Sequence, residues 1–131
     1  MQWDKIHIIE AFHDCPRSGF ADFKSRPHFY DRQFDEAADD FADTWMLVEV
    51  DQRTLDAAFA RHEIWLRWQS AFDQGLTGIE THPALLPDRA RYTELDKEIS
   101  AQIAANGGTA LIKRGVFRYP GNWAEVCWRA S

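Results

Sequence analysis

Cysteine, positive charge and long apolar runs are all scarce in this sequence. Its 131 residues include two cysteines, Cys15 and Cys127, which are too few to form a disulfide framework. We therefore expect a reducing compartment, in agreement with a first segment that lacks the basic start and apolar core of a secretion signal. No apolar stretch is long enough to span a bilayer, so the sequence predicts a cytoplasmic protein without a membrane segment.

The charge balance is acidic and uneven. The 15 basic and 21 acidic residues give a net charge of −6, so the chain has no cationic surplus for neutralising nucleic-acid phosphates or anionic lipids. Residues 31–56 carry nine acidic side chains against two basic ones, which places most of the imbalance in one stretch. An acidic patch suits a partner protein with a basic surface, and a solvated, solubilising surface explains the same composition. The candidate interaction residues are Asp35, Glu36, Asp39, Asp40 and Asp43.

Length and composition predict a single domain over residues 1–131. The chain is 45% hydrophobic and 14% aromatic, which is enough to build one core without cross-links. Runs rich in apolar and β-branched residues predict strands, whereas residues 17–27, which contain Gly19 and end at Pro27, predict a loop. The expected strands are residues 5–12, 28–34, 44–50, 109–119 and 123–130.

Two helices are predicted between the third and fourth of these strands. Thr54 as a cap and Gly75 as a stop bound the first helix, and Pro87 and Gly107 bound the second. The order of elements is then β-β-β-α-α-β-β. Because short connections favour antiparallel pairing, we expect an α+β fold, with a mostly antiparallel sheet of about five strands and two helices packed on one face.

The helix predicted at residues 54–75 is apolar around most of its circumference, which indicates a central place in the core or an apolar face toward a partner. His62 and Gln69 interrupt this apolar arc, and Arg61 lies beside a row of aromatic residues. In one interpretation these side chains are the polar floor of a pocket; in the other, backbone and neighbouring side chains satisfy them. The candidate pocket residues are Arg61, His62, Trp65, Trp68 and Gln69.

No motif amounts to a catalytic signature. Cys15 is the best candidate nucleophile because His13 is two residues away, but a lone cysteine is usually inert unless its pKa is lowered. His13 and Cys15 also lack the second Cys or His pair that marks a zinc site, and no glycine-rich phosphate loop is present. We therefore expect no metal and no cofactor, and we favour a function without catalysis.

Tryptophan is abundant, because the six tryptophans exceed what one small core easily absorbs. We expect Trp3, Trp123 and part of the pair Trp65 and Trp68 to be partly exposed, with an aromatic-rich core as the alternative. Together with the acidic stretch, this favours a protein–protein interaction module that binds a basic partner protein or forms a homodimer. The alternative is a small-molecule-binding protein or minor enzyme with a pocket beside residues 54–75.

Four short stretches carry a resemblance to other proteins: residues 25–29, 64–68, 81–85 and 88–92. Together they resemble a family of small bacterial proteins that has no assigned activity, over about residues 10–100. The resemblance implies a free-standing bacterial domain. It brings no catalytic residue and no function with it.

Overall fold

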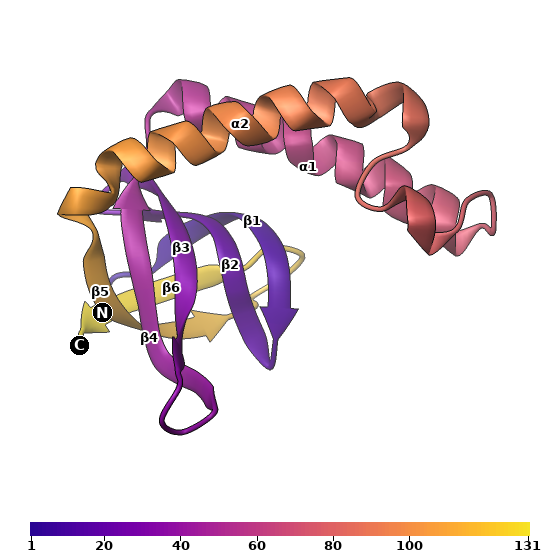
Figure 1. Cartoon of the computed structure of the whole chain (residues 1–131). Helices are drawn as coiled ribbons and strands as arrows, with labels where there is room; N and C mark the ends of the chain where they lie inside the picture. Colours follow the sequence, from indigo (N-terminus) through magenta and orange to yellow (C-terminus); the bar gives the residue numbers. More distant parts are fainter. The chain divides into compact units, whose positions relative to one another are not determined.

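Six antiparallel strands form a closed barrel in the computed structural model, which describes all residues from 1 to 131 (Figure 1). Each strand pairs with its neighbour in the sequence, and the last strand pairs with the first. The predicted α+β class is confirmed, but the open sheet of about five strands is wrong, because the sheet has a sixth strand and closes on itself. The strands are β1 (Asp4–His13), β2 (Cys15–Phe23), β3 (Arg26–Asp35), β4 (Asp40–Glu49), β5 (Leu111–Arg118) and β6 (Glu125–Ala130).

The additional strand is β2, which covers most of the loop expected at residues 17–27. Pro16 is the second residue of this strand and lies where the β1–β2 ladder is irregular, a position at which proline is tolerated. Gly19 marks a close approach of two strands rather than a turn. A Cβ atom at Gly19 would collide with the carbonyl oxygen of Ile8 and would lie 2.8 Å from the Tyr30 hydroxyl. The proline and glycine that predict a loop therefore belong to a strand, and the barrel requires glycine at position 19.

Aromatic side chains fill the interior of the barrel. Tyr30 is fully buried, and the rings of Trp45, Phe117 and Trp128 contact one another around it, with centroid distances between 5.2 and 6.3 Å. The Tyr30 hydroxyl donates to the carbonyl of Ile8 at 3.2 Å, so its polar end is satisfied, and burial raises the pKa of this phenol. A small barrel filled in this way has a packed core rather than a channel.

The barrel closes through its shortest ladder. β1 and β6 share two residue pairs, Asp4 with Val126 and Lys5 with Glu125, whereas β2 and β3 pair over six positions. The β3–β4 hairpin joins its strands through a turn at residues 36–39, and the β2–β3 hairpin joins its strands through residues 24–25 alone. These two turns lie at opposite ends of β3 because the three strands are antiparallel.

Residues 52–102 form a second compact unit, separate from the unit made by residues 1–51 and 103–131. Its helix α1 begins two residues before the predicted start, and Gly75 follows its end with a φ of 73°. The amide of Leu76 donates to the carbonyl of Ala71 at 2.9 Å, which is the C-terminal bonding pattern that favours glycine at this position. Neither helix has the combined length and apolar character of a membrane span. The helical elements are α1 (Gln52–Asp73), η1 (Ile79–Thr81), η2 (Leu86–Asp88), α2 (Arg89–Asn106) and η3 (Gly107–Thr109).

Candidate functional site

Trp68, one of the predicted pocket residues on α1, is a structural side chain of the helical unit. It is 3% exposed, and its indole nitrogen donates to the hydroxyl of Thr81 at 2.8 Å. Its ring stacks on Phe72 at a centroid distance of 5.0 Å and meets the edge of His82 at 4.6 Å. These contacts join α1 to the segment that precedes α2, so Trp68 holds the helical unit together.

The polar residues of the predicted pocket also have protein partners. Arg61 donates to Asp96 on α2 at 2.7 Å, and Gln69 donates to Asp73 one helical turn later at 2.8 Å. His62 stacks on Trp65 at a centroid distance of 5.8 Å. Burial lowers the pKa of the His62 imidazole, the Arg61 charge lowers it further, and Glu63 opposes both effects.

A cavity of about 330 Å³ lies between α1 and α2, but its walls are formed by residues other than those of the predicted pocket. The predicted pocket residues on α1 do not line it, and the ones that do are mostly charged. Side chains such as Arg53 and Glu98, which form an ion pair at 2.9 Å, make it a solvated groove. Its lining residues are Arg53, Asp56, Ala57, Ala60, Arg91, Leu95 and Glu98.

The five predicted acidic interaction residues are all exposed, in and beside the β3–β4 turn. We call residues 35–40 the acidic tip. Asp35 accepts hydrogen bonds from the amides of Ala37 and Ala38 at 3.0 and 3.3 Å, so its carboxylate caps the turn. Asp40 accepts from the amide of the next residue at 2.7 Å. Asp43 lies outside the tip and pairs with Arg114 at 2.7 Å.

Glu36 and Asp39 differ from the other three carboxylates because neither forms a side-chain hydrogen bond or ion pair within the chain. Both side chains are exposed in the turn, and Asp39 adopts a φ of 51° there. Aspartate is among the residues that tolerate this left-handed conformation best. The acidic tip therefore presents two carboxylates that are structurally uncommitted.

An aromatic groove lies beside the acidic tip, with Phe41 at its centre. The Phe34 ring meets Phe41 edge-on at 5.4 Å, and the His13 ring lies 5.2 Å from it. The guanidinium carbon atoms of Arg17 and Arg32 lie 4.7 and 5.5 Å from the centre of the same ring. We call this hollow of about 360 Å³ the Phe41 groove; its lining residues are Arg17, Asp31, Arg32, Gln33, Phe34, Phe41 and Met46.

The charged residues of the Phe41 groove have unequal freedom. Arg32 is fixed, because it donates to the carbonyls of Ala42 at 2.7 Å and His13 at 3.4 Å. Arg17 is exposed and has the Phe41 ring as its neighbour but no ion pair. Burial raises the pKa of the Asp31 carboxyl, and the nearby Arg17 charge opposes that shift. The groove therefore combines apolar walls with one cation and one carboxylate that form no ion pair.

Sequence reasoning identified the acidic stretch but attributed the aromatic part of the surface to tryptophan. Trp123 is 52% exposed and Trp3 is half-buried beneath Arg118, at 4.0 Å from its guanidinium carbon. The aromatic residues next to the acidic tip are instead Phe34, which is 50% exposed, and Phe41. These two residues pair across the hairpin, and their symmetrical placement around residues 35–40 is the signal that could have identified them.

Cys15, the candidate nucleophile, packs against the barrel core. Burial raises the pKa of its thiol, the charge of Arg32 opposes this shift, and Asp14 adds to it. The His13 ring packs on Phe41. A raised thiol pKa disfavours the thiolate that nucleophilic chemistry requires. No group of three or more His, Cys, Asp or Glu side chains is arranged to hold a metal ion.

No protein-family model matches the chain, and comparisons with curated proteins and with solved structures gave no significant similarity.

Proposed function

We propose that this protein is an interaction module that binds a segment of another protein along the Phe41 groove and the acidic tip. The observation that carries the proposal is the half-exposed Phe34, packed on Phe41 at the wall of a 360 Å³ hollow and directly followed by the acidic tip. Binding energy in protein interfaces concentrates in aromatic and arginine side chains at the centre, surrounded by a polar rim. The Phe41 groove has this arrangement.

The partner segment is expected to be basic and to carry at least one apolar side chain. Residues 31–43 include six carboxylates against the cation Arg32, which is already bonded to backbone carbonyls, and Arg17 on β2 is the one other cation that lines the groove. The uncommitted carboxylates of Glu36 and Asp39 suit lysine or arginine side chains of the partner, which they attract over distance. An apolar side chain next to those basic residues would cover Phe34 and Phe41.

A second copy of the chain is a poorer occupant of this surface than a basic partner. The whole chain carries a net charge of −6, and two acidic tips brought together repel each other. We therefore propose a different protein as the partner. The experiment distinguishes the two cases, because self-association changes the hydrodynamic size of the isolated protein.

The test uses a displayed library of random twelve-residue peptides selected on the full chain. We expect the selected peptides to combine lysine or arginine with an aromatic or branched apolar residue. Fluorescence polarisation then measures one labelled peptide against variants. Phe34→Ala should weaken binding by at least about tenfold, whereas Leu76→Ala, which removes another exposed apolar side chain in a different part of the chain, should leave it unchanged.

The charge contribution has its own pair of variants. The double variant Glu36→Gln/Asp39→Asn should weaken binding several-fold and flatten its dependence on salt, because exposed charges are screened by ions. Glu63→Gln/Glu94→Gln removes two exposed carboxylates elsewhere and serves as the matched control. Equal losses in the two double variants, selected peptides without basic residues, or no peptide that depends on Phe34 would contradict the proposal.

A further inference from the structure

A second hollow, of about 230 Å³, lies at the other end of β3, beside the β2–β3 turn. Two cations, Lys24 and Arg26, and one carboxylate, Glu49, line it, and it differs from the Phe41 groove because no acidic tip borders it. Its walls come from the β2–β3 hairpin, the end of β4 and the start of β5. We call it the cationic cavity; its lining residues are Phe23, Lys24, Arg26, His28, Glu49 and Leu111.

Two lysine ammonium groups lie over the Phe23 ring: Lys24 lines the cavity, and Lys113 on β5 contacts the same ring without being part of the lining. The nitrogen of Lys24 lies 5.4 Å from the ring centre, and that of Lys113 lies 5.5 Å from it. Neither lysine forms an ion pair, whereas the third cation, Arg26, pairs with Glu49 at 3.1 Å. Two unpaired ammonium groups within 5.5 Å of the centre of one ring make its surroundings positively charged, which favours an anion there.

The buried wall of the cavity is an imidazole that the backbone holds in place. His28 is 5% exposed, and its Nδ1 donates to the carbonyl of Arg26 at 2.8 Å, which leaves Nε2 as the second polar atom of the ring. Its ring meets the edge of Phe23 at a centroid distance of 5.6 Å. A buried polar side chain with fixed orientation is typical of a ligand site built into a scaffold.

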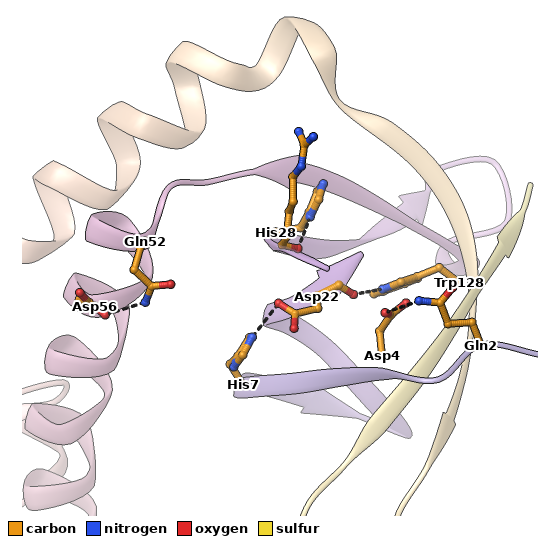
Figure 2. Close-up of polar contacts among 9 residues, drawn as sticks. Gln2, Asp4, His7, Asp22, His28, Gln52, Asp56 and Trp128 are labelled. Atoms are coloured by element: carbon orange, nitrogen blue, oxygen red, sulfur yellow. Dashed lines mark hydrogen bonds and ion pairs between the residues drawn. The ribbon is translucent and has the colours of Figure 1, made fainter. Parts of the chain in front are cut away.

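The one carboxylate that lines the cavity, Glu49, is paired with Arg26, and two other carboxylates of the barrel lie outside the lining. Asp22 contacts His7 at 2.8 Å, and Asp4 lies on β1 with Gln2 as its hydrogen-bond donor (Figure 2). Neither lines the cavity. Their negative charge disfavours an anion deep in the barrel and leaves the lysine-bearing rim as the favourable place for one. Phe23 and Leu111 offer an apolar surface for the rest of such a ligand.

We propose that the cationic cavity binds a small organic carboxylate, with its carboxylate near Lys24 and Lys113 and its compact apolar part against Phe23 and Leu111. The volume supports a small ligand, because 230 Å³ lies below the roughly 300–1,000 Å³ typical of drug-sized ligand sites. The apolar walls favour an organic acid over inorganic phosphate, which would leave them uncovered. This inference is independent of the proposed peptide surface.

The test is a titration of the uniformly ¹⁵N-labelled full chain, followed by amide NMR shifts, with three probes at constant ionic strength. Benzoate is the expected ligand, benzyl alcohol is its uncharged counterpart, and inorganic phosphate is an anion without an apolar part. We expect saturable shifts with benzoate at residues 23–28 and 111–113. Benzyl alcohol should bind at least about tenfold more weakly, and phosphate should give no saturable shift there.

Variants assign the binding to the lysines. Lys24→Gln and Lys113→Gln should each weaken benzoate binding by about fivefold or more, whereas Lys97→Gln on α2 should leave it unchanged. Lys24 is exposed, so its replacement spares the core. The proposal is overturned if benzoate gives no saturable shift at up to about 20 mM, if benzyl alcohol or phosphate binds equally well, or if the two cavity variants behave like Lys97→Gln.

Discussion

The two ends of strand β3 carry opposite charge and are built in different ways. At its start, Lys24 and Arg26 surround a cavity with buried His28; at its end, the acidic tip borders the Phe41 groove. The ten residues of β3 separate the ends by about 30 Å at the usual rise of a strand, several times the ~8 Å over which salt screens charges in cells. A small, acidic barrel can therefore present two electrostatically independent surfaces.

The turns at these two ends are stabilised differently. The acidic tip uses its own side chains, because Asp35 and Asp40 accept backbone amide hydrogen bonds. The β2–β3 turn has no such support and places both Lys24 and Ser25 in the left-handed region, at φ values of 52° and 62°. Neither residue is a type that this region favours. The Lys24 side chain, which this turn carries, lies over the Phe23 ring.

The largest predicted effect is a loss of stability from a substitution in the interior of the barrel, because the surfaces at both ends of β3 require the folded barrel. Gly19→Ala should lower the free energy of unfolding by about 3 kcal/mol or more, because its Cβ atom would collide with Ile8 and approach Tyr30. Urea denaturation measures this change, and peptide and benzoate binding should be lost together as the protein unfolds. Gly107→Ala, with nothing within 4 Å of the added Cβ atom, is the control. A folded Gly19→Ala variant of wild-type stability would contradict this account of the barrel.

A smaller effect distinguishes the two turns. Ser25→Gly should raise the free energy of unfolding by about 0.5–1 kcal/mol, because glycine adopts positive φ without steric cost. Asp39→Gly should have a smaller effect, since aspartate tolerates its φ of 51° better than serine tolerates 62°. Chemical denaturation of both variants at neutral pH tests the difference. Equal gains would mean that the two turns carry the same strain.

The smallest effect is a dependence on pH. Burial raises the pKa of the Asp4 carboxyl above its usual value of 3.8, the Asp22 charge adds to this, and the Gln2 hydrogen bond opposes it. The folded state therefore holds this proton more tightly than the unfolded state, so ionisation of Asp4 destabilises the fold as pH rises through that range. Asp4→Asn removes the ionisation and should stabilise the protein at pH 7 by up to about 0.5 kcal/mol.

The same variant should give no gain below pH 3.8, the usual carboxyl pKa, where both states are protonated. Asp31→Asn, in the half of β3 that leads to the acidic tip, should also raise the free energy of unfolding at pH 7, because burial raises the pKa of the Asp31 carboxyl. The charge of Arg17 opposes that shift. Urea denaturation at a series of pH values measures both. A gain for Asp4→Asn that persists unchanged at pH 3 would contradict the electrostatic explanation.

The elements that the sequence predicted are those with local signals. Residues 54–75 show a long helical pattern that ends in Gly75, and the structure has α1 there with Gly75 at a φ of 73°. The sequence does not predict β2, because Pro16 and Gly19 usually indicate loops and their roles here depend on β1 and Tyr30. Closure of the barrel depends on two residue pairs between β1 and β6, and no pattern within a single segment of the sequence predicts it.

The same distinction applies to the candidate sites. The acidic tip is visible in the composition of residues 31–56, because charge needs no tertiary information. Lys24 lies on the β2–β3 turn and Lys113 lies on β5, so their common neighbour Phe23 is evident only from the folded chain. Arg61 and Gln69 are predicted pocket residues because they are polar residues on an apolar helix, and in the structure their partners are Asp96 and Asp73.

The short β1–β6 ladder has a consequence for how the chain folds during synthesis. Asp4 and Val126, which close the barrel, are nearly the whole chain apart, and contacts of such separation form slowly. A nascent chain that has emerged only through β4 is a meander whose outer edges, on β1 and β4, still lack their neighbours. Unpaired strand edges invite association with other chains, so we expect association to be most favourable in the interval before β5 and β6 emerge.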